Sequence, residues 1–364
     1  MRGRRVSICA ASVALFMSLS TGASADVVDR LTLPEKVGQL VMFSVQGEHL
    51  TAIERDLIRR HHLGGVILFG NNYSGRAQLK ALTSRIQRVV KRGSGAGVGA
   101  LISVDQEGGV VKRFKDMPPW RSAPELGALN DLDVTRGQGR ATGRELRRAG
   151  VNIDLAPVAD LDIGPKHVMR NRAFGSRPRH VAKHVVAFSR GLQARRVAEA
   201  VKHFPGLGGA DRNSDAGPAY VRRSRGQLRK IDALPFKRAI AEGARAIMMS
   251  HAIYPNDGGR KPASLNPFIA SKRLRRHLGF EGVSMSDAID AMTWWFDGEI
   301  GKTCAATIRA GVDVALLANN VYAGRTCARA IVRATRQGSI RRERIDRAAR
   351  RVIELKRWLG VYGK

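Results

Sequence analysis

Residues 100–109 read Ala-Leu-Ile-Ser-Val-Asp-Gln-Glu-Gly-Gly, an apolar run that gives way at once to carboxylates and glycines. A short apolar run with β-branched members is typical of a strand that is buried on both faces. Strands of this kind belong to parallel sheets, whose carboxyl ends carry the binding and catalytic groups. The segment therefore predicts a buried parallel strand that ends in functional polar residues.

Seven further apolar runs share this character. The eight runs are Gly38–Val45, Gly65–Phe69, Ala100–Val104, Val151–Pro157, Val197–Val201, Ala246–Ser250, Gly282–Met285 and Val314–Leu317. Amphipathic helical patterns lie between them, including Arg76–Lys91, Arg136–Ala149, His180–Arg195, Leu234–Ala244, Asn266–Leu278 and Cys304–Ala310. This alternation predicts an α/β fold in which a parallel sheet closes as a (β/α)8 TIM-type barrel. A doubly wound open sheet is the alternative, although no Gly-x-Gly-x-x-Gly turn follows the first strand.

The first 25 residues have the pattern of an export signal. Arginines at positions 2, 4 and 5 precede the apolar run Val6–Leu19, and Ala23-Ser24-Ala25 resembles a cleavage site. We therefore expect residues 1–25 to be a signal peptide and the protein to be periplasmic or extracellular. Residues 26–364 are expected to form a single barrel domain, with the amphipathic stretch Arg341–Leu359 as a terminal helix packed on its outside.

Two cysteines, Cys304 and Cys327, remain after the leader. An oxidising compartment permits a disulfide between them, but two buried thiols are equally compatible with the spacing. The chain has no Cys-x-x-Cys or His-Glu-x-x-His pattern, so we expect no bound metal.

The chain is strongly basic, with 63 Lys and Arg against 31 Asp and Glu and a net charge of +32. Loss of the leader would remove only three of these charges. Such an excess attracts polyanions in general and does not indicate which polyanion binds. Because arginine recurs in nearly every helical stretch, we expect a charge spread over solvated helix faces, with electrostatic association to an anionic envelope but no specific nucleic-acid partner.

Polar residues directly follow several of the other predicted strands. They are Lys202-His203 after the fifth strand, Ser250-His251 after the sixth and Ser286-Asp287 after the seventh. Carboxylates among lysine, arginine, histidine and glycine suit a carbohydrate site, because Asp binds sugar hydroxyls and an ionised carboxylate can attack an oxocarbenium-like carbon. The predicted strand ends therefore favour a glycan-processing site.

Seven segments of the chain resemble those of a known enzyme family. They are HHLGGVILFGNN, SVDQEGGVVKRF, VNIDLAPVADLD, RNRAFG, KHFPGLGG, MMSHAIYP and LGFEGVSMSDAIDAM, in order from His61 to Met292. Together they resemble family 3 glycoside hydrolases of the single-domain bacterial type, similar to β-N-acetylhexosaminidases. The resemblance covers most of the chain.

The resemblance implies a role for each matching residue. Asp105, Arg113, Arg172, Lys202 and His203 would hold the sugar next to the scissile bond, and His251 is assigned to the same substrate-binding set. Asp287, in the Ser-Asp pair that ends the seventh strand, would be the nucleophile.

The chain departs from the hexosaminidase pattern in the loop after the fifth strand. That pattern is Lys-His-Phe-Pro-Gly-His-Gly followed by Asp-Ser-His, whose Asp-His pair is the general acid/base. Here Leu207 replaces the second His, and Asn213-Ser214-Asp215 replaces Asp-Ser-His without a gap. Asp215 could act as the acid if its pKa is raised. Asp211 is a second candidate, and loss of acid catalysis is the third possibility.

We therefore expect an exported, monomeric, retaining β-glycosidase that needs no cofactor. It would hydrolyse terminal β-linked N-acetylglucosamine in cell-wall or chitin-like oligosaccharides. The alternatives are a β-glucosidase-like hydrolase and an inactive sugar-binding homologue that lacks the acid/base.

Overall fold

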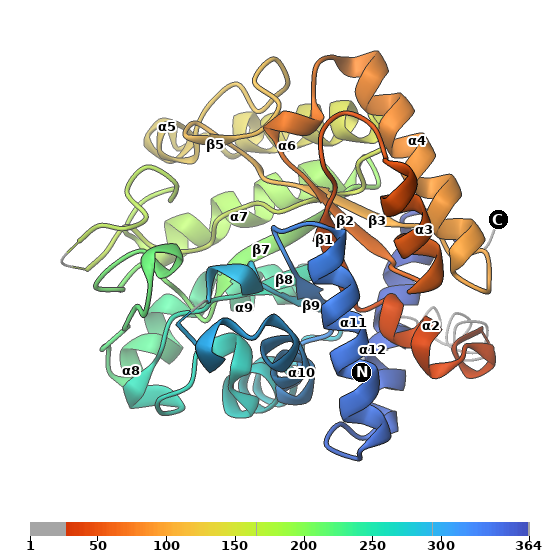
Figure 1. The fold of residues 1–364 in the computed structure, drawn as a ribbon. Coiled ribbons are helices and arrows are strands. Elements are labelled where there is room, and N and C mark those ends of the chain that lie inside the picture. The colour runs from red at the N-terminus through yellow and green to blue at the C-terminus, as the bar shows by residue number, and fades with distance from the viewer. Residues whose placement is uncertain (1–26, 165, 293, 363–364) are drawn as a thin grey trace, which may run out of the picture.

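The computed structural model describes residues 27–164, 166–292 and 294–362. The predicted signal peptide at residues 1–25 lies outside the described residues. Figure 1 shows a central barrel of strands surrounded by helices.

The barrel is an eight-stranded parallel sheet. Its strands are β1 (Val41–Ser44), β2 (Gly65–Leu68), β3 (Leu101–Val104), β6 (Ile153–Asp154), β7 (Ala198–Phe204), β8 (Ala246–Met249), β9 (Val283–Ser286) and β10 (Ala315–Leu316). They pair in the order β10-β1-β2-β3-β6-β7-β8-β9. The ring closes where Met285 in β9 pairs with Val314, directly before β10. The predicted (β/α)8 TIM-type barrel is therefore confirmed, and each strand lies at its predicted apolar run.

Two strands differ from their predicted extent. The run Val151–Pro157 contributes only β6, and directly before this strand the side chain of Asn152 bonds to the Ile102 amide and the Ala100 carbonyl. Strand β7 instead continues to Phe204. Lys202 and His203 are therefore part of a buried strand and do not lie in a loop after it.

Helices pack around the strands. The longer ones are α3 (Ala52–Arg60), α4 (Arg76–Gly93), α6 (Leu132–Arg148), α7 (Pro178–Gln193), α9 (Leu234–Ala241), η6 (Phe268–His277), α10 (Ile300–Ala310), α11 (Val321–Arg336) and α12 (Arg342–Trp358). Shorter helices are α2 (Leu33–Gly38), α5 (Ala123–Leu129) and α8 (Arg225–Gln227), and a small hairpin joins β4 (Gln106–Gly108) to β5 (Val111–Lys112).

Apolar spacing explains which face of each helix is buried. In α4, Leu79, Leu82, Ile86 and Val89 recur at intervals of three or four residues, and all are buried. The start of α3 is fixed by a capping box between Thr51 and Glu54. Among the described residues, every helix is too short or too polar to cross a lipid bilayer.

Helix α12 does not pack on the barrel's flank. Lys356 Nζ donates to the Gly64 carbonyl at 2.9 Å, Arg344 Nη2 donates to the Val312 carbonyl at 2.6 Å, and the Val361 carbonyl just beyond the helix accepts from Gly99 N at 3.0 Å. These three partners precede β2, β10 and β3. The helix therefore lies on the outside of the barrel, across its amino-terminal end.

The two cysteines form a disulfide that joins α10 to α11. Cys304 and Cys327 are fully buried, and their Cα atoms are 5.5 Å apart. Of the two states that the sequence allowed, the structure has the bonded one.

Candidate active site

A cavity of about 330 Å³ opens at the carboxyl ends of the barrel strands. Seven of the eight predicted site residues line it, namely Asp105, Arg113, Arg172, Lys202, His203, Asp215 and Asp287. They reach it from β7 and from the segments that follow β3, β6, β7 and β9. The fold thus gathers polar groups that are up to 182 residues apart in the sequence.

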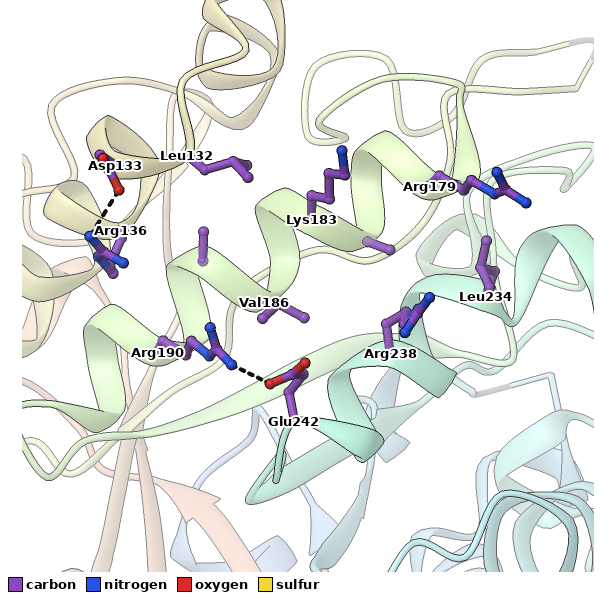
Figure 2. Close-up of a pocket in the computed structure, with 12 residues that line it drawn as sticks. Leu132, Asp133, Arg136, Arg179, Lys183, Val186, Arg190, Leu234, Arg238 and Glu242 are labelled. Carbon is purple, nitrogen blue, oxygen red and sulfur yellow. Dashed lines mark hydrogen bonds and ion pairs between the residues drawn. The ribbon is translucent and has the colours of Figure 1, made fainter. Parts of the chain in front are cut away.

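A second hollow, of about 560 Å³, lies on the flank of the barrel between α6, α7 and α9 (Figure 2). Its two carboxylates are held by surface ion pairs, Asp133 with Arg136 and Glu242 with Arg190. Because these carboxylates are committed to arginines and do not converge on a common point, the cavity at the strand ends is the candidate active site.

A buried network of charges forms one wall of this cavity. Lys202 Nζ donates to Asp105 Oδ1 and to Glu107 Oε1, both at 2.6 Å. Arg172 makes a bidentate pair with Glu107, through Nε at 2.9 Å and Nη2 at 2.7 Å. Glu107 thereby holds two cations at once, and it belongs to the site although it was not among the predicted site residues.

The network fixes the charge of its members. Burial would raise the pKa of Glu107, but Lys202 and Arg172 lower it to about 2. Burial also opposes the charge of Lys202, yet Asp105 and Glu107 raise its pKa. Glu107 and Lys202 are therefore both ionised at neutral pH.

Arg113 stands at the edge of the network. Its Nη2 lies 3.6 Å from Asp105 Oδ2. Its Nε is buried without a hydrogen-bond partner among the described residues. An unpartnered buried donor beside a carboxylate is suited to a substrate oxygen.

Asp160 orients His203. Its carboxylate is fully buried and accepts from His203 Nδ1 at 2.6 Å, from the His203 amide and from the Leu207 amide. Sequence reasoning did not select Asp160, although it follows the apolar run that contains β6 and was quoted in the segment VNIDLAPVADLD. With Nδ1 held by Asp160, the other ring nitrogen of His203 remains for the cavity.

Asp287 directly follows β9. Its Oδ1 accepts from the Ala288 amide at 2.8 Å. Burial alone would raise the pKa of Asp287, but the imidazoles of His203 and His251 and the Ala288 amide together lower it below its usual range. An ionised, oriented carboxylate is what a nucleophile at a sugar carbon requires.

His251 does not line the cavity. Its ring is fully buried, with Nε2 3.1 Å from the Ala288 carbonyl and Nδ1 2.8 Å from Ser264 Oγ. Because a carbonyl can only accept, Nε2 carries the proton and Nδ1 accepts from the hydroxyl. Burial lowers the pKa of His251. The structure therefore places this residue behind Asp287, where it supports the backbone next to it.

The loop after β7 gives different roles to its two aspartates. Asp211 Oδ1 accepts from the Tyr220 amide at 2.9 Å, and the Asp211 amide donates to the Tyr220 carbonyl, so this residue closes the base of the loop. Leu207, which occupies the position of the expected histidine, is buried. Asp211 is absent from the cavity lining, whereas Asp215 is part of it.

Asp215 is positioned by a short helical turn. Asn213 Oδ1 accepts from the Asp215 amide at 3.1 Å, which starts the turn η2 (Ser214–Ala216). Desolvation at the cavity and the negative charge of Asp287 both raise the pKa of Asp215. The two carboxylates therefore have pKa values that are shifted in opposite directions, as in an acid and nucleophile pair.

No group of three or more His, Cys, Asp or Glu side chains within the described ranges is placed to hold a metal ion. The polar groups of the cavity are instead those that bind hydroxyls and transfer protons.

Comparison with known proteins gives consistent matches. The model of the glycosyl hydrolase family 3 N-terminal domain matches residues 32–355. A β-hexosaminidase from Stenotrophomonas maltophilia is 35% identical over 288 residues, which cover 76% of this chain and 83% of that protein. A β-hexosaminidase from Methylococcus capsulatus is 32% identical over 320 residues, which cover 85% of this chain and 93% of that protein.

Solved structures agree with these sequence matches. A family 3 β-N-acetylglucosaminidase from a Paenibacillus species has a TM-score of 0.86 and 33% identity. The match covers 92% of this chain but only 64% of that longer one. A β-N-acetylhexosaminidase from Beutenbergia cavernae has a TM-score of 0.83 and 29% identity. That match covers 90% of this chain and 98% of the other.

Proposed function

The chain belongs to glycoside hydrolase family 3, and on this basis we propose that it is an exported retaining β-glycosidase. Its proposed substrates are cell-wall or chitin-like fragments with terminal β-linked N-acetylglucosamine. The observation that carries the proposal is the pair Asp287 and Asp215, which line one cavity with pKa values shifted in opposite directions. The names of the similar β-hexosaminidases support the choice of sugar.

In the first step, Asp287 attacks the anomeric carbon and forms a covalent glycosyl-enzyme. Asp215, protonated because its pKa is raised, gives its proton to the leaving oxygen. In the second step, the ionised Asp215 removes a proton from water, and that water displaces Asp287 with net retention. The same residue thus serves as acid and then as base.

The charged network supplies the sugar-binding wall. Asp105 accepts from sugar hydroxyls, Arg113 Nε donates to a sugar oxygen, and the free ring nitrogen of His203 bonds to another hydroxyl. Lys202 and Arg172 are held in place by Glu107, so their positions are fixed before substrate arrives. Such preorganisation lowers the free energy spent on ordering the site during the reaction.

Two features support export. The leader pattern at residues 1–25 is that of a signal peptide. The disulfide between Cys304 and Cys327 is the state expected in an oxidising compartment.

A nitrophenyl glycoside panel tests the proposal. The protein should hydrolyse the N-acetylglucosaminide faster than the glucoside, and Asp287→Asn should lower turnover by several orders of magnitude. Preference for the glucoside would favour the β-glucosidase-like alternative. No hydrolysis of any activated glycoside, together with retained binding of N-acetylglucosamine, would favour the sugar-binding alternative.

A further inference from the structure

A second polar pocket, of about 510 Å³, lies at the opposite end of the barrel from the active site, between η6, α10 and α12. We call it the arginine pocket. It is lined by Arg275, Arg276, Arg309, Arg341, Arg344, Arg347 and Arg351, together with Ser271, Ser339, Gly311 and Ile340. None of the lining residues is acidic.

Three arginines form the inner wall and share one carboxylate. Arg344 Nη2 lies 3.0 Å from Asp313 Oδ1, Arg351 Nη1 lies 3.2 Å from the same oxygen, and Arg275 binds Oδ2. Asp313 is fully buried beneath them. One negative charge therefore faces three positive ones, and the Nε of Arg275 is buried without a partner among the described residues.

The three inner arginines repel one another electrostatically in this arrangement. Burial together with the charges of Arg351 and Arg344 lowers the pKa of Arg275 to about 10, against the opposing effect of Asp313. A second anion in the pocket would relieve that repulsion.

Four arginines form the rim. Arg276, Arg309, Arg341 and Arg347 are exposed, and within the described part of the chain their side chains make no hydrogen bond or ion pair. Their guanidinium groups add four further charges without any carboxylate. They are free to turn toward a ligand.

The amino terminus of α12 also faces this region. Arg341 is the residue that precedes the helix, and no side chain caps the helix start. The helix has 17 residues, so its dipole adds positive potential where the rim arginines gather.

The arginine pocket differs from the flank groove in how its arginines are paired. In the flank groove of Figure 2, Arg136 and Arg190 each pair with a carboxylate of the same groove. In the arginine pocket, three of the seven arginines share the single buried carboxylate of Asp313, and the other four have no acidic partner among the described residues.

We propose that the arginine pocket binds a multiply ionised phosphate group, either on a soluble phosphate compound or on a phospholipid headgroup. The planar guanidinium matches phosphate oxygens through two parallel hydrogen bonds, and several such groups around one hollow suit a ligand of more than one negative charge. The pocket lies at the amino-terminal end of the strands, so an occupant would leave the catalytic cavity open. The inference does not depend on the proposed glycosidase activity.

Titration calorimetry with inorganic pyrophosphate, at about 150 mM salt, tests the proposal. The wild-type protein should bind one pyrophosphate, and Arg309→Gln combined with Arg347→Gln should weaken binding at least tenfold. The matched control is Arg179→Gln with Arg238→Gln, which removes two exposed arginines from the groove in Figure 2 and should weaken binding less than twofold. Unchanged melting temperatures establish that both double variants are folded.

Sedimentation with phosphatidic acid vesicles, against phosphatidylcholine vesicles, separates the two phosphate sources, because the phosphomonoester of phosphatidic acid can carry two negative charges. If the pocket variant loses both pyrophosphate and phosphatidic acid binding, the ligand is a lipid headgroup. If it loses pyrophosphate alone, the ligand is a soluble phosphate compound. Absence of pyrophosphate binding by wild type, or equal weakening in the two double variants, would overturn the proposal, since attraction would then be diffuse or absent.

Discussion

Replacement of Glu107 by Gln should destabilise the protein and disturb the active site together. The side chain is 7% exposed and holds both Lys202 and Arg172. Glutamine keeps the shape but removes the charge, which leaves Arg172 without its bidentate carboxylate partner. The change therefore tests whether the buried network is a source of stability as well as of geometry.

The magnitude follows from the pKa of Glu107, which falls from 4.5 to about 2 on folding. At about 1.4 kcal/mol per pKa unit, that shift corresponds to about 3 kcal/mol of stability. Breaking a buried pair by removal of one partner costs a similar amount, about 3–5 kcal/mol. Because the folded pKa is lowered, this contribution is present above pH 4.5 and is lost as the pH falls through about 2.

Urea unfolding of wild type and Glu107→Gln at pH 7 and pH 3 measures the effect. The difference in unfolding free energy should be about 3 kcal/mol or more at pH 7 and should shrink by roughly half at pH 3. The control Glu242→Gln removes an exposed pair with Arg190 and should change stability by no more than about 1 kcal/mol. A Glu107→Gln protein as stable as wild type, or a difference independent of pH, would refute the reasoning.

Three further variants test other parts of the account. Asp215→Ala should slow hydrolysis of substrates with poor leaving groups by at least about a hundredfold and spare the first step for nitrophenyl leaving groups, with azide restoring turnover; unchanged rates on both substrate kinds would remove Asp215 from the mechanism. Cys304→Ala with Cys327→Ala should lower the unfolding free energy by about 3 kcal/mol, read from denaturant midpoints, because the disulfide closes a loop of 23 residues. Asp160→Asn should reduce kcat for N-acetylglucosaminides by about tenfold or more and alter the pH profile, since His203 loses its orienting charge; a wild-type profile would show that this contact is only structural.

The pH dependence of kcat/KM should be bell-shaped. The acidic limb reports protonation of Asp287, whose pKa is lowered, and the basic limb reports ionisation of Asp215, whose pKa is raised. In Asp215→Ala the basic limb should disappear for nitrophenyl substrates while the acidic limb remains. A basic limb that is unchanged in the variant would show that another group is the acid.

The strands were predictable because parallel barrel strands are buried on both faces, so that each appears as a continuous apolar run bounded by polar residues. The position of α12 was not predictable in the same way. Amphipathic spacing identifies its buried face, as at Ile345 and Val352, but not the surface that this face meets. That surface is set by tertiary contacts such as those of Arg344 and Lys356 at the barrel's amino-terminal end.

In the candidate site, too, some residues were predictable from local sequence and others are defined only by tertiary contacts. Asp105 and Asp287 directly follow apolar runs, and the order of the strands around the barrel brings them to one rim. The pair of Glu107 with Arg172 joins residues 65 apart in sequence, and no local pattern encodes it. Likewise, the sequence ranked Asp215 above Asp211 only because Asp215 occupies the position of the expected histidine. The backbone bonds that commit Asp211 to Tyr220 exist only in the folded loop.

Covalent trapping of the glycosyl-enzyme tests the central claim most directly. The protein is incubated with a fluorinated N-acetylglucosaminyl fluoride, digested and sequenced by mass spectrometry. The account predicts a single added sugar on the peptide that contains Asp287, and none in Asp287→Asn. A sugar on a different carboxylate, or turnover of nitrophenyl N-acetylglucosaminide without any labelled peptide, would contradict it.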